Sequence, residues 1–130
     1  MTPSRRVLLA VAAGGAVGGL ARYGLTQLAA DGTGFPWTTF AINLSGSMLL
    51  AGLLLLPLAR QSPLWAAALG PGVLGGYTTF SAASEQTRDL LDRGCYGLAI
   101  GYLLGTLAAC LVAVTVIGRL APPLPEEDEL

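Results

Sequence analysis

The sequence predicts an all-α integral membrane protein with four transmembrane helices, the third of them broken near its centre. Its composition is too apolar for an ordinary soluble domain of 130 residues, with 53% hydrophobic and 12% charged residues and a mean hydropathy of +0.64. Four apolar segments follow one another, each close to the ~20 residues needed to cross a ~30 Å hydrocarbon core. They cover residues 7–28, 38–59, 64–91 and 95–117. We therefore expect one membrane domain over residues 1–120 and a disordered acidic tail over 121–130.

Charge and composition exclude several classes of function. The net charge is −1, the seven cations form no basic patch, and we therefore expect no binding of nucleic acid. Histidine is absent, which removes the commonest general base and metal ligand. Because the four spans use almost the whole chain, no room remains for a separate enzyme. The function is expected within the bilayer or at its edges.

The distribution of arginines bears on orientation. Four arginines fall on the side shared by both termini and two on the other side, a bias that favours cytoplasmic termini but leaves insertion both ways round open. The first group is Arg5, Arg6, Arg60 and Arg119, and the second is Arg88 and Arg93. We expect a multi-pass protein of the cell's inner (plasma) membrane.

The first span carries glycines at the spacing of helix contacts. Gly14, Gly15, Gly18 and Gly19 form two overlapping GxxxG patterns, which leave a flat strip that another helix can approach closely. Arg22 follows this strip near the end of the span. Two roles are open for it, extension to the lipid headgroups or attraction of an anion.

The second and fourth spans each carry a polar line. Thr39, Asn43 and Ser47 recur at i, i+4 and i+8, which aligns them on one face of a helix. Tyr102, Thr106 and Cys110 do the same in the fourth span. A polar line of this kind either bonds to a neighbouring helix or forms the wall of a pore. The amide of Asn43 is the most costly member to leave unpaired in hydrocarbon.

The third span contains glycines and hydroxyls at its middle, in residues 72–81. Paired glycines at Gly75 and Gly76 free the backbone, and a helix break at bilayer depth is tolerated only where protein buries it or where it lines a cavity. Carbonyls released by the break are suitable oxygen ligands for a hard cation. The alternative is a continuous, glycine-softened helix whose threonines bond back to their own carbonyls.

Three motifs occur together in order along the chain. They are Gly14-Gly15-Ala16-Val17-Gly18-Gly19-Leu20-Ala21-Arg22-Tyr23, Asn43-Leu44-Ser45-Gly46-Ser47 and Gly75-Gly76-Tyr77-Thr78-Thr79-Phe80-Ser81. Together they closely resemble the CrcB/Fluc fluoride channels, over all four spans. The resemblance implies a fluoride-specific channel that exports fluoride to reduce its concentration and toxicity in the cell. It also implies an antiparallel, dual-topology dimer with two pores and a structural sodium ion at its centre.

The resemblance further implies roles for matched residues. The sodium ion, which is not transported, is expected on the backbone carbonyls of Gly75 and Thr78 from each subunit. Fluoride is expected along a path of polar and aromatic side chains that replace its water. The pore residues carried over or chosen as donors are Asn43, Phe80, Ser84, Tyr102, Thr106 and Arg22.

Two positions depart from the family's pattern. Ala83 stands where the family has a second phenylalanine, and Gln86 stands at its glutamate position, with Glu85 one residue early. The dimer partner is therefore either a second copy or a paralogous subunit that supplies the missing ring. The chain could accordingly be a non-conducting partner subunit of a heterodimeric channel. A small four-helix multidrug exporter is a further alternative, but it needs an acid within a helix, which the first span lacks.

Overall fold

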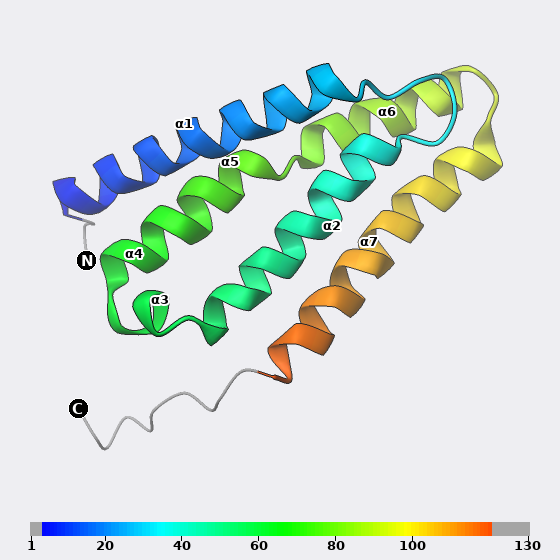
Figure 1. Cartoon of the computed structure of the whole chain (residues 1–130). Helices are drawn as coiled ribbons and strands as arrows, with labels where there is room; N and C mark the ends of the chain where they lie inside the picture. The colour runs from blue at the N-terminus through cyan, green and yellow to red at the C-terminus, as the bar shows by residue number, and fades with distance from the viewer. Residues whose placement is uncertain (1–3, 121–130) are drawn as a thin grey trace.

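The structure, a computed structural model, describes residues 4–120, and every regular element in that range is helical (Figure 1). The predicted acidic tail, residues 121–130, lies outside the described residues. The elements in chain order are α1 (Arg5–Leu28), α2 (Trp37–Gly52), the 3₁₀ helix η1 (Leu53–Leu55), α3 (Pro57–Gln61), α4 (Pro63–Ala67), the π-helix η2 (Ala68–Leu74), α5 (Gly75–Tyr77), α6 (Phe80–Asp92) and α7 (Tyr96–Gly118).

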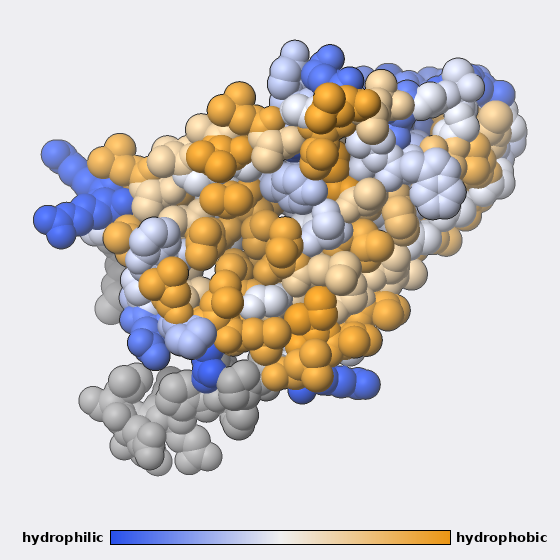
Figure 2. Space-filling view, in the orientation of Figure 1, coloured by the Kyte–Doolittle hydropathy of each residue, from blue (hydrophilic) through white to orange (hydrophobic). Residues whose placement is uncertain are grey.

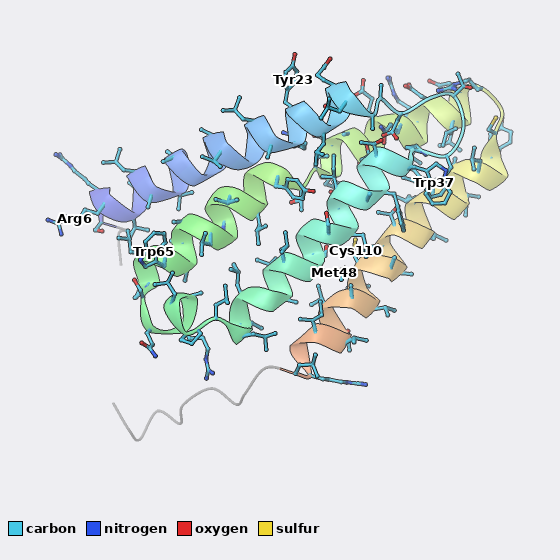
Figure 3. All side chains as sticks on the ribbon, in the orientation of Figure 1. Arg6, Tyr23, Trp37, Met48, Trp65 and Cys110 are labelled. Atoms are coloured by element: carbon cyan, nitrogen blue, oxygen red, sulfur yellow. The ribbon has the colours of Figure 1, made fainter. Side chains whose placement is uncertain are left out.

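Three of these helical segments are long and apolar enough to cross a membrane. They are Arg5–Leu28, Trp37–Leu55 and Tyr96–Gly118. Apolar side chains cover the middle of the face shown in Figure 2, and hydrophilic side chains gather at its margins. Trp65 lies near Arg6 at one end of the bundle and Trp37 lies at the opposite end (Figure 3), as expected for aromatics at two membrane interfaces. The chain is a multi-pass membrane protein.

The second predicted span is shorter than expected. Residues 38–59 were expected to be continuous, but α2 and η1 end at Leu55 and a new helix begins at Pro57. Pro57 has no backbone N–H and disfavours helical backbone in the residue before it. Leu56 accordingly has an extended conformation, with φ −89° and ψ 117°.

The third predicted span, residues 64–91, is divided into two halves. Residues of α4, η2 and α5 form the first half, and α6 forms the second. Thr78 and Thr79, between them, have extended backbone, with ψ of 159° and 115°. The predicted break is confirmed, and the alternative of a continuous softened helix is wrong. The π-helix was not predicted; its wide turns accommodate Pro71, which has no N–H to donate.

The glycine strip of α1 packs on the first half of the broken segment. A Cβ atom added at Gly14 or Gly18 would collide with the backbone of η2, and one added at Gly76 would collide with the backbone of Gly15. Figure 1 shows α1 alongside α4 and α5 over this length. The prediction that the strip lets another helix approach is thus confirmed. The similar pair in α7, Gly101 and Gly105, has open space around it in the described part of the chain.

The second half of the broken segment packs against α2 and α7. A small buried core joins Ala83 and Leu90 of α6 to Ala99 and Tyr102 of α7, and Phe35 and Phe40 pack against it. Gly94, whose φ of +76° is favourable only for glycine, makes the tight turn between α6 and α7. The start of α1, the hairpin of α3 and α4, and the end of α7 lie toward one end of the bundle, opposite that turn (Figure 1).

Candidate functional site

The break in the third segment is held open by a side chain from α2. The Asn43 amide nitrogen donates to the Thr79 carbonyl at 2.9 Å, and the Thr79 backbone N–H donates to the Asn43 amide oxygen at 2.8 Å. An asparagine amide has the same donor and acceptor as a peptide group, so it can pair with one backbone unit in both directions. Asn43 therefore replaces the helical acceptor that the Thr79 N–H lost and adds a second bond to the Thr79 carbonyl.

Threonine hydroxyls form hydrogen bonds with the backbone at both helix ends beside the break. Thr79 is the N-cap of α6 and accepts from the Ala82 N–H at 3.1 Å. The Thr78 hydroxyl donates to the Leu74 carbonyl at 2.9 Å, within the last turn before the break. These bonds satisfy backbone groups that lipid could not.

The same bonds engage the helical donors of two of the carbonyls that the break releases. In a continuous α-helix the Gly75 carbonyl would accept from the Thr79 N–H, which instead donates to Asn43. The Thr78 carbonyl would accept from the Ala82 N–H, which instead donates to the Thr79 hydroxyl. Gly75 and Thr78 therefore present carbonyl oxygens whose helical donors are engaged elsewhere. Such oxygens suit a hard cation such as sodium.

The carbonyl of Gly76, between these two, binds Arg22. Arg22 lies in the last turns of α1 and is half-buried, and its Nε–H donates to this carbonyl at 3.2 Å. Arg22 thus ties α1 to the segment before the break. It is not among the residues that line the cavity described next, so the structure does not bring it together with the other predicted pore residues.

A cavity of about 560 Å³ lies beside the break, between α2, η2, α6 and α7. Most of the predicted site residues line it, together with apolar side chains and with Ser47 and Cys110 from the two polar lines. Figure 3 shows Cys110 between α7 and α2. The predicted residues in the wall are Asn43, Gly75, Thr78, Phe80, Tyr102 and Thr106. Ser84 is exposed on α6 and does not line it.

Phe80 and Ala83, one turn apart on α6, differ sharply in how far they are exposed. Phe80 is 80% exposed, so its ring stands free beside the break, whereas Ala83 is 5% exposed and packs in the small core with Tyr102. A ring edge carries positive potential and can contact an anion, which a methyl group does not offer. The wall thus contains one phenylalanine per chain, as the sequence indicated.

Several hydroxyl protons of the wall are donated within the protein. Thr106 donates to the Tyr102 carbonyl at 2.6 Å, Thr78 donates to Leu74 as described, and Tyr102 donates to the Gln86 amide oxygen at 2.8 Å. Asn43 uses one of its two N–H groups for Thr79 and lines the cavity. Asn43 and Ser47 are therefore the polar residues of α2 that line this space.

One residue next to the site was missed by the sequence reasoning. Asp31, in the connection between α1 and α2, accepts hydrogen bonds from the backbone N–H groups of Thr38 (2.7 Å) and Thr39 (3.0 Å), and from the Thr39 hydroxyl (2.7 Å). Its Oδ2 also accepts from Gln86 at 3.0 Å. An acid directly before a helix is a capping signal, but a stretch of loop separates Asp31 from the first residue of α2 and conceals it.

The charge of Asp31 is stabilised where it lies. Partial burial on its own would raise the pKa of the carboxyl. The hydrogen bonds from the Thr39 hydroxyl, the two backbone N–H groups and Gln86 outweigh burial and hold that pKa below its ordinary value. Asp31 is therefore a carboxylate at neutral pH.

Comparisons with known proteins agree on one family. The family model described as "CrcB-like protein, Camphor Resistance (CrcB)" matches residues 9–119. A protein of Phenylobacterium zucineum named fluoride-specific ion channel FluC is 43% identical over 115 residues, covering 84% of this chain and 90% of its own length. Fluoride-specific ion channel FluC 1 of Mycolicibacterium paratuberculosis is 42% identical over 122 residues, covering 88% of this chain and 89% of its own.

Proposed function

The chain belongs to the CrcB-like protein family, and on that basis we propose that it forms a fluoride-specific ion channel that lets fluoride leave the cell. The activity is transport, not catalysis. The observation that carries the proposal is the cavity beside the break, where Asn43, Phe80, Tyr102 and Thr106 from three helices line one space. These are residues to which the resemblance assigns a place in the pore.

The chemistry of this wall suits a small anion that must both enter and leave. Fluoride holds its water strongly, so a path needs closely spaced groups that replace that water. A ring of arginines would bind the anion tightly and slow its release. The cavity wall instead offers the Asn43 amide, the Ser47 hydroxyl and the exposed edge of Phe80. Such weak, serial contacts favour conduction.

The working unit is proposed to be an antiparallel, dual-topology dimer in the inner (plasma) membrane. Supporting this, Phe80 is 80% exposed at the cavity, so a second subunit packed there would complete the wall around its ring. The modest arginine bias between the two ends of the chain permits insertion both ways round.

A structural sodium ion is proposed at the centre of that dimer. Gly75 and Thr78 would hold it through their backbone carbonyls, two from each subunit. The bonding pattern at the break supports this choice, because the helical donors of both carbonyls bind elsewhere. The ion would neutralise the facing carbonyl dipoles of two broken segments and so fix the subunits together. It would not be transported.

A second candidate function rests on Ala83. The chain could be a subunit that conducts only beside a related chain with phenylalanine at that position, because Ala83 offers no ring edge to the path. The two candidates differ in a single measurable property, the conduction of the homodimer.

The test is fluoride efflux from liposomes that contain the purified chain alone, followed with a fluoride electrode. Fast efflux, with chloride retained, is expected for a homodimeric channel. Efflux that requires co-reconstitution with a related, phenylalanine-containing chain would identify a partner subunit. Absence of fluoride efflux from both preparations would contradict the proposed function, provided that the protein remains folded and inserted.

A further inference from the structure

A second cavity, of about 610 Å³, lies at the end of the bundle that contains the hairpin of α3 and α4. Its wall is formed by α2, η1, the hairpin and η2, and its larger apolar residues are Leu50, Leu53, Leu54, Pro57, Ala66 and Pro71. Arg60 and Gln61 add two polar side chains to this wall. Leu50 and Leu54 are each 49% exposed, so the cavity is open to the surroundings of the protein. For a membrane protein, those surroundings are lipid.

The polar and apolar parts of this wall lie at different depths. Arg60 and Gln61 belong to α3, in the hairpin at the end of the bundle (Figure 1), where Trp65 also lies (Figure 3). Leu50 and Pro71 line the cavity at the helix break as well, so they lie at the other end of the second cavity. The second cavity therefore runs from the membrane interface toward the middle of the bilayer. It is polar at its outer end and apolar at its inner end.

This arrangement is complementary to a phospholipid. The apolar inner end is unsuited to water, which needs several polar partners, whereas an acyl chain needs none. At the outer end, a guanidinium group binds phosphate oxygens through its forked N–H donors, and a glutamine amide adds two further N–H groups. Arg60 and Gln61 are both exposed, so a headgroup at the membrane surface can reach them.

The charge at the outer end favours one class of phospholipid. Among the described residues that line this cavity, Arg60 is the only charged one, so no carboxylate of the same wall offsets it. A zwitterionic headgroup brings its own positive amine to this place, whereas an anionic headgroup does not. One arginine near the membrane surface raises the affinity for an anionic lipid about fivefold.

We propose that the second cavity is a binding site for one anionic phospholipid, with the headgroup phosphate on Arg60 and Gln61 and one acyl chain along the leucines of η1 and α2. The chain fills the apolar opening, and the arginine selects the headgroup. The site requires neither fluoride conduction nor a dimer, so its test is independent of the proposed function.

The test is the quenching of tryptophan fluorescence by brominated lipids, which reports contact between a tryptophan and the brominated acyl chain. In a chain with Trp37→Phe and Trp65→Phe, the substitution Leu54→Trp puts the only tryptophan in the cavity wall. Leu55→Trp is the matched control, because Leu55 is the next residue, is 40% exposed and does not line the cavity. Each protein is reconstituted in phosphatidylcholine at low salt, and brominated phosphatidylglycerol or brominated phosphatidylcholine is titrated in.

At position 54, the anionic lipid is expected to bind about fivefold more tightly than the zwitterionic lipid. The two affinities are expected to become equal in Arg60→Gln. The preference should persist in Arg60→Lys, which keeps the charge, and in Arg119→Gln, which removes an exposed charge from the end of α7 without altering the cavity wall. At position 55, equal affinities are expected in all of these proteins.

Equal affinities at position 54, the same preference at position 55, or a preference that survives Arg60→Gln would each overturn the proposal. Loss of the preference when inorganic phosphate replaces chloride at constant ionic strength would identify a free anion, and not a lipid, as the ligand. If Leu54→Trp does not fold, Trp65 in Trp37→Phe is the reporter, because it directly precedes Ala66 of the wall. Trp37 in Trp65→Phe is then the control, at the opposite end of the bundle (Figure 3), and the same outcomes decide.

Discussion

At the scale of single residues, Asn43 shows how one side chain stabilises an irregular backbone inside a membrane protein. Its amide pairs with both the N–H and the C=O of Thr79, and it also lines the cavity. The polar line of α2 therefore binds a neighbouring segment, the first of the two roles that the sequence left open, and part of it lines the cavity. Asn43 binds a neighbouring segment, and Ser47, one turn further on, faces the cavity.

We expect Asn43→Ala to destabilise the protein as well as to lower fluoride flux. The change leaves the Thr79 backbone N–H unpaired where water is scarce, at a cost of about 1–3 kcal/mol. Thermal unfolding in detergent measures the first effect and liposome efflux the second. Ser47→Ala is the matched control for stability, and a midpoint for Asn43→Ala equal to that of the control would contradict the pairing.

Asp31 gives a pH dependence whose sign follows from its lowered pKa. The folded carboxyl has a lower pKa than the unfolded one, so its contribution to stability is complete above the unfolded pKa and disappears as pH falls through the folded pKa. Burial opposes this shift, and the bonds from Thr38, Thr39 and Gln86 outweigh it. Asp89 and Arg93 line the small cavity next to the carboxylate.

Wild type is therefore expected to be more stable than Asp31→Asn at neutral pH, with the difference shrinking under acid conditions. Unfolding midpoints of both proteins between pH 7 and pH 3 measure this. Parallel curves over the whole range would show that the folded carboxyl has its ordinary pKa.

At the scale of elements, the contact between α1 and the broken segment depends on which glycines face it. Gly14 and Gly18 lie against the backbone of η2, whereas Gly19 has no atom within 4 Å of an added Cβ. The two overlapping GxxxG patterns are therefore not equivalent. Only the geometry of the neighbouring segment distinguishes them.

Gly18→Ala and Gly19→Ala are expected to change stability in opposite directions. An added methyl at position 18 collides with the Val73 backbone and costs roughly 1–3 kcal/mol through overpacking. The same methyl at position 19 meets open space and favours the helix by about 0.5–1 kcal/mol. Unfolding midpoints of the two variants test this, and equal shifts would mean that α1 does not pack as described.

At the scale of the whole molecule, the proposed sodium ion makes stability depend on the cation present. The carbonyls of Gly75 and Thr78 suit a small hard cation and not a large organic one. We expect dimers in detergent to dissociate more readily in N-methylglucamine than in sodium, as measured by the fraction of dimer on dilution. Gly75→Val should weaken assembly in sodium too. A dimer equally stable in both cations would argue against the site.

The burial of Ala83 determines whether the second phenylalanine of the family's pattern can be introduced into this chain. It is 5% exposed and packed against Tyr102 and Ala99, so Ala83→Phe is expected to destabilise the protein by roughly 1–3 kcal/mol. We therefore expect more flux from pairing with a phenylalanine-containing chain than from this substitution. Stability and efflux of Ala83→Phe are measured together. Higher flux from a stable Ala83→Phe homodimer would show that the cavity has room for the ring.

The sequence by itself determined the membrane class, the helix break and most of the wall of the site. Apolar length, glycine spacing and periodicity are local properties, and periodicity aligned Asn43 on one face of α2 and Tyr102 and Thr106 on one face of α7, all of which line one cavity. The resemblance, and not periodicity, indicated Thr78. Pro57 is also a local signal, because a proline there ends the second span. The apolar residues that continue past it made the span look longer.

Only the tertiary structure decided which residues far apart in the chain form hydrogen bonds with each other. Asn43 meets Thr79, Arg22 meets Gly76, and Asp31 meets Gln86 over separations of 36, 54 and 55 residues. No periodicity contains such pairs, because a hydrogen bond depends on where two distant segments pack and not on their own patterns.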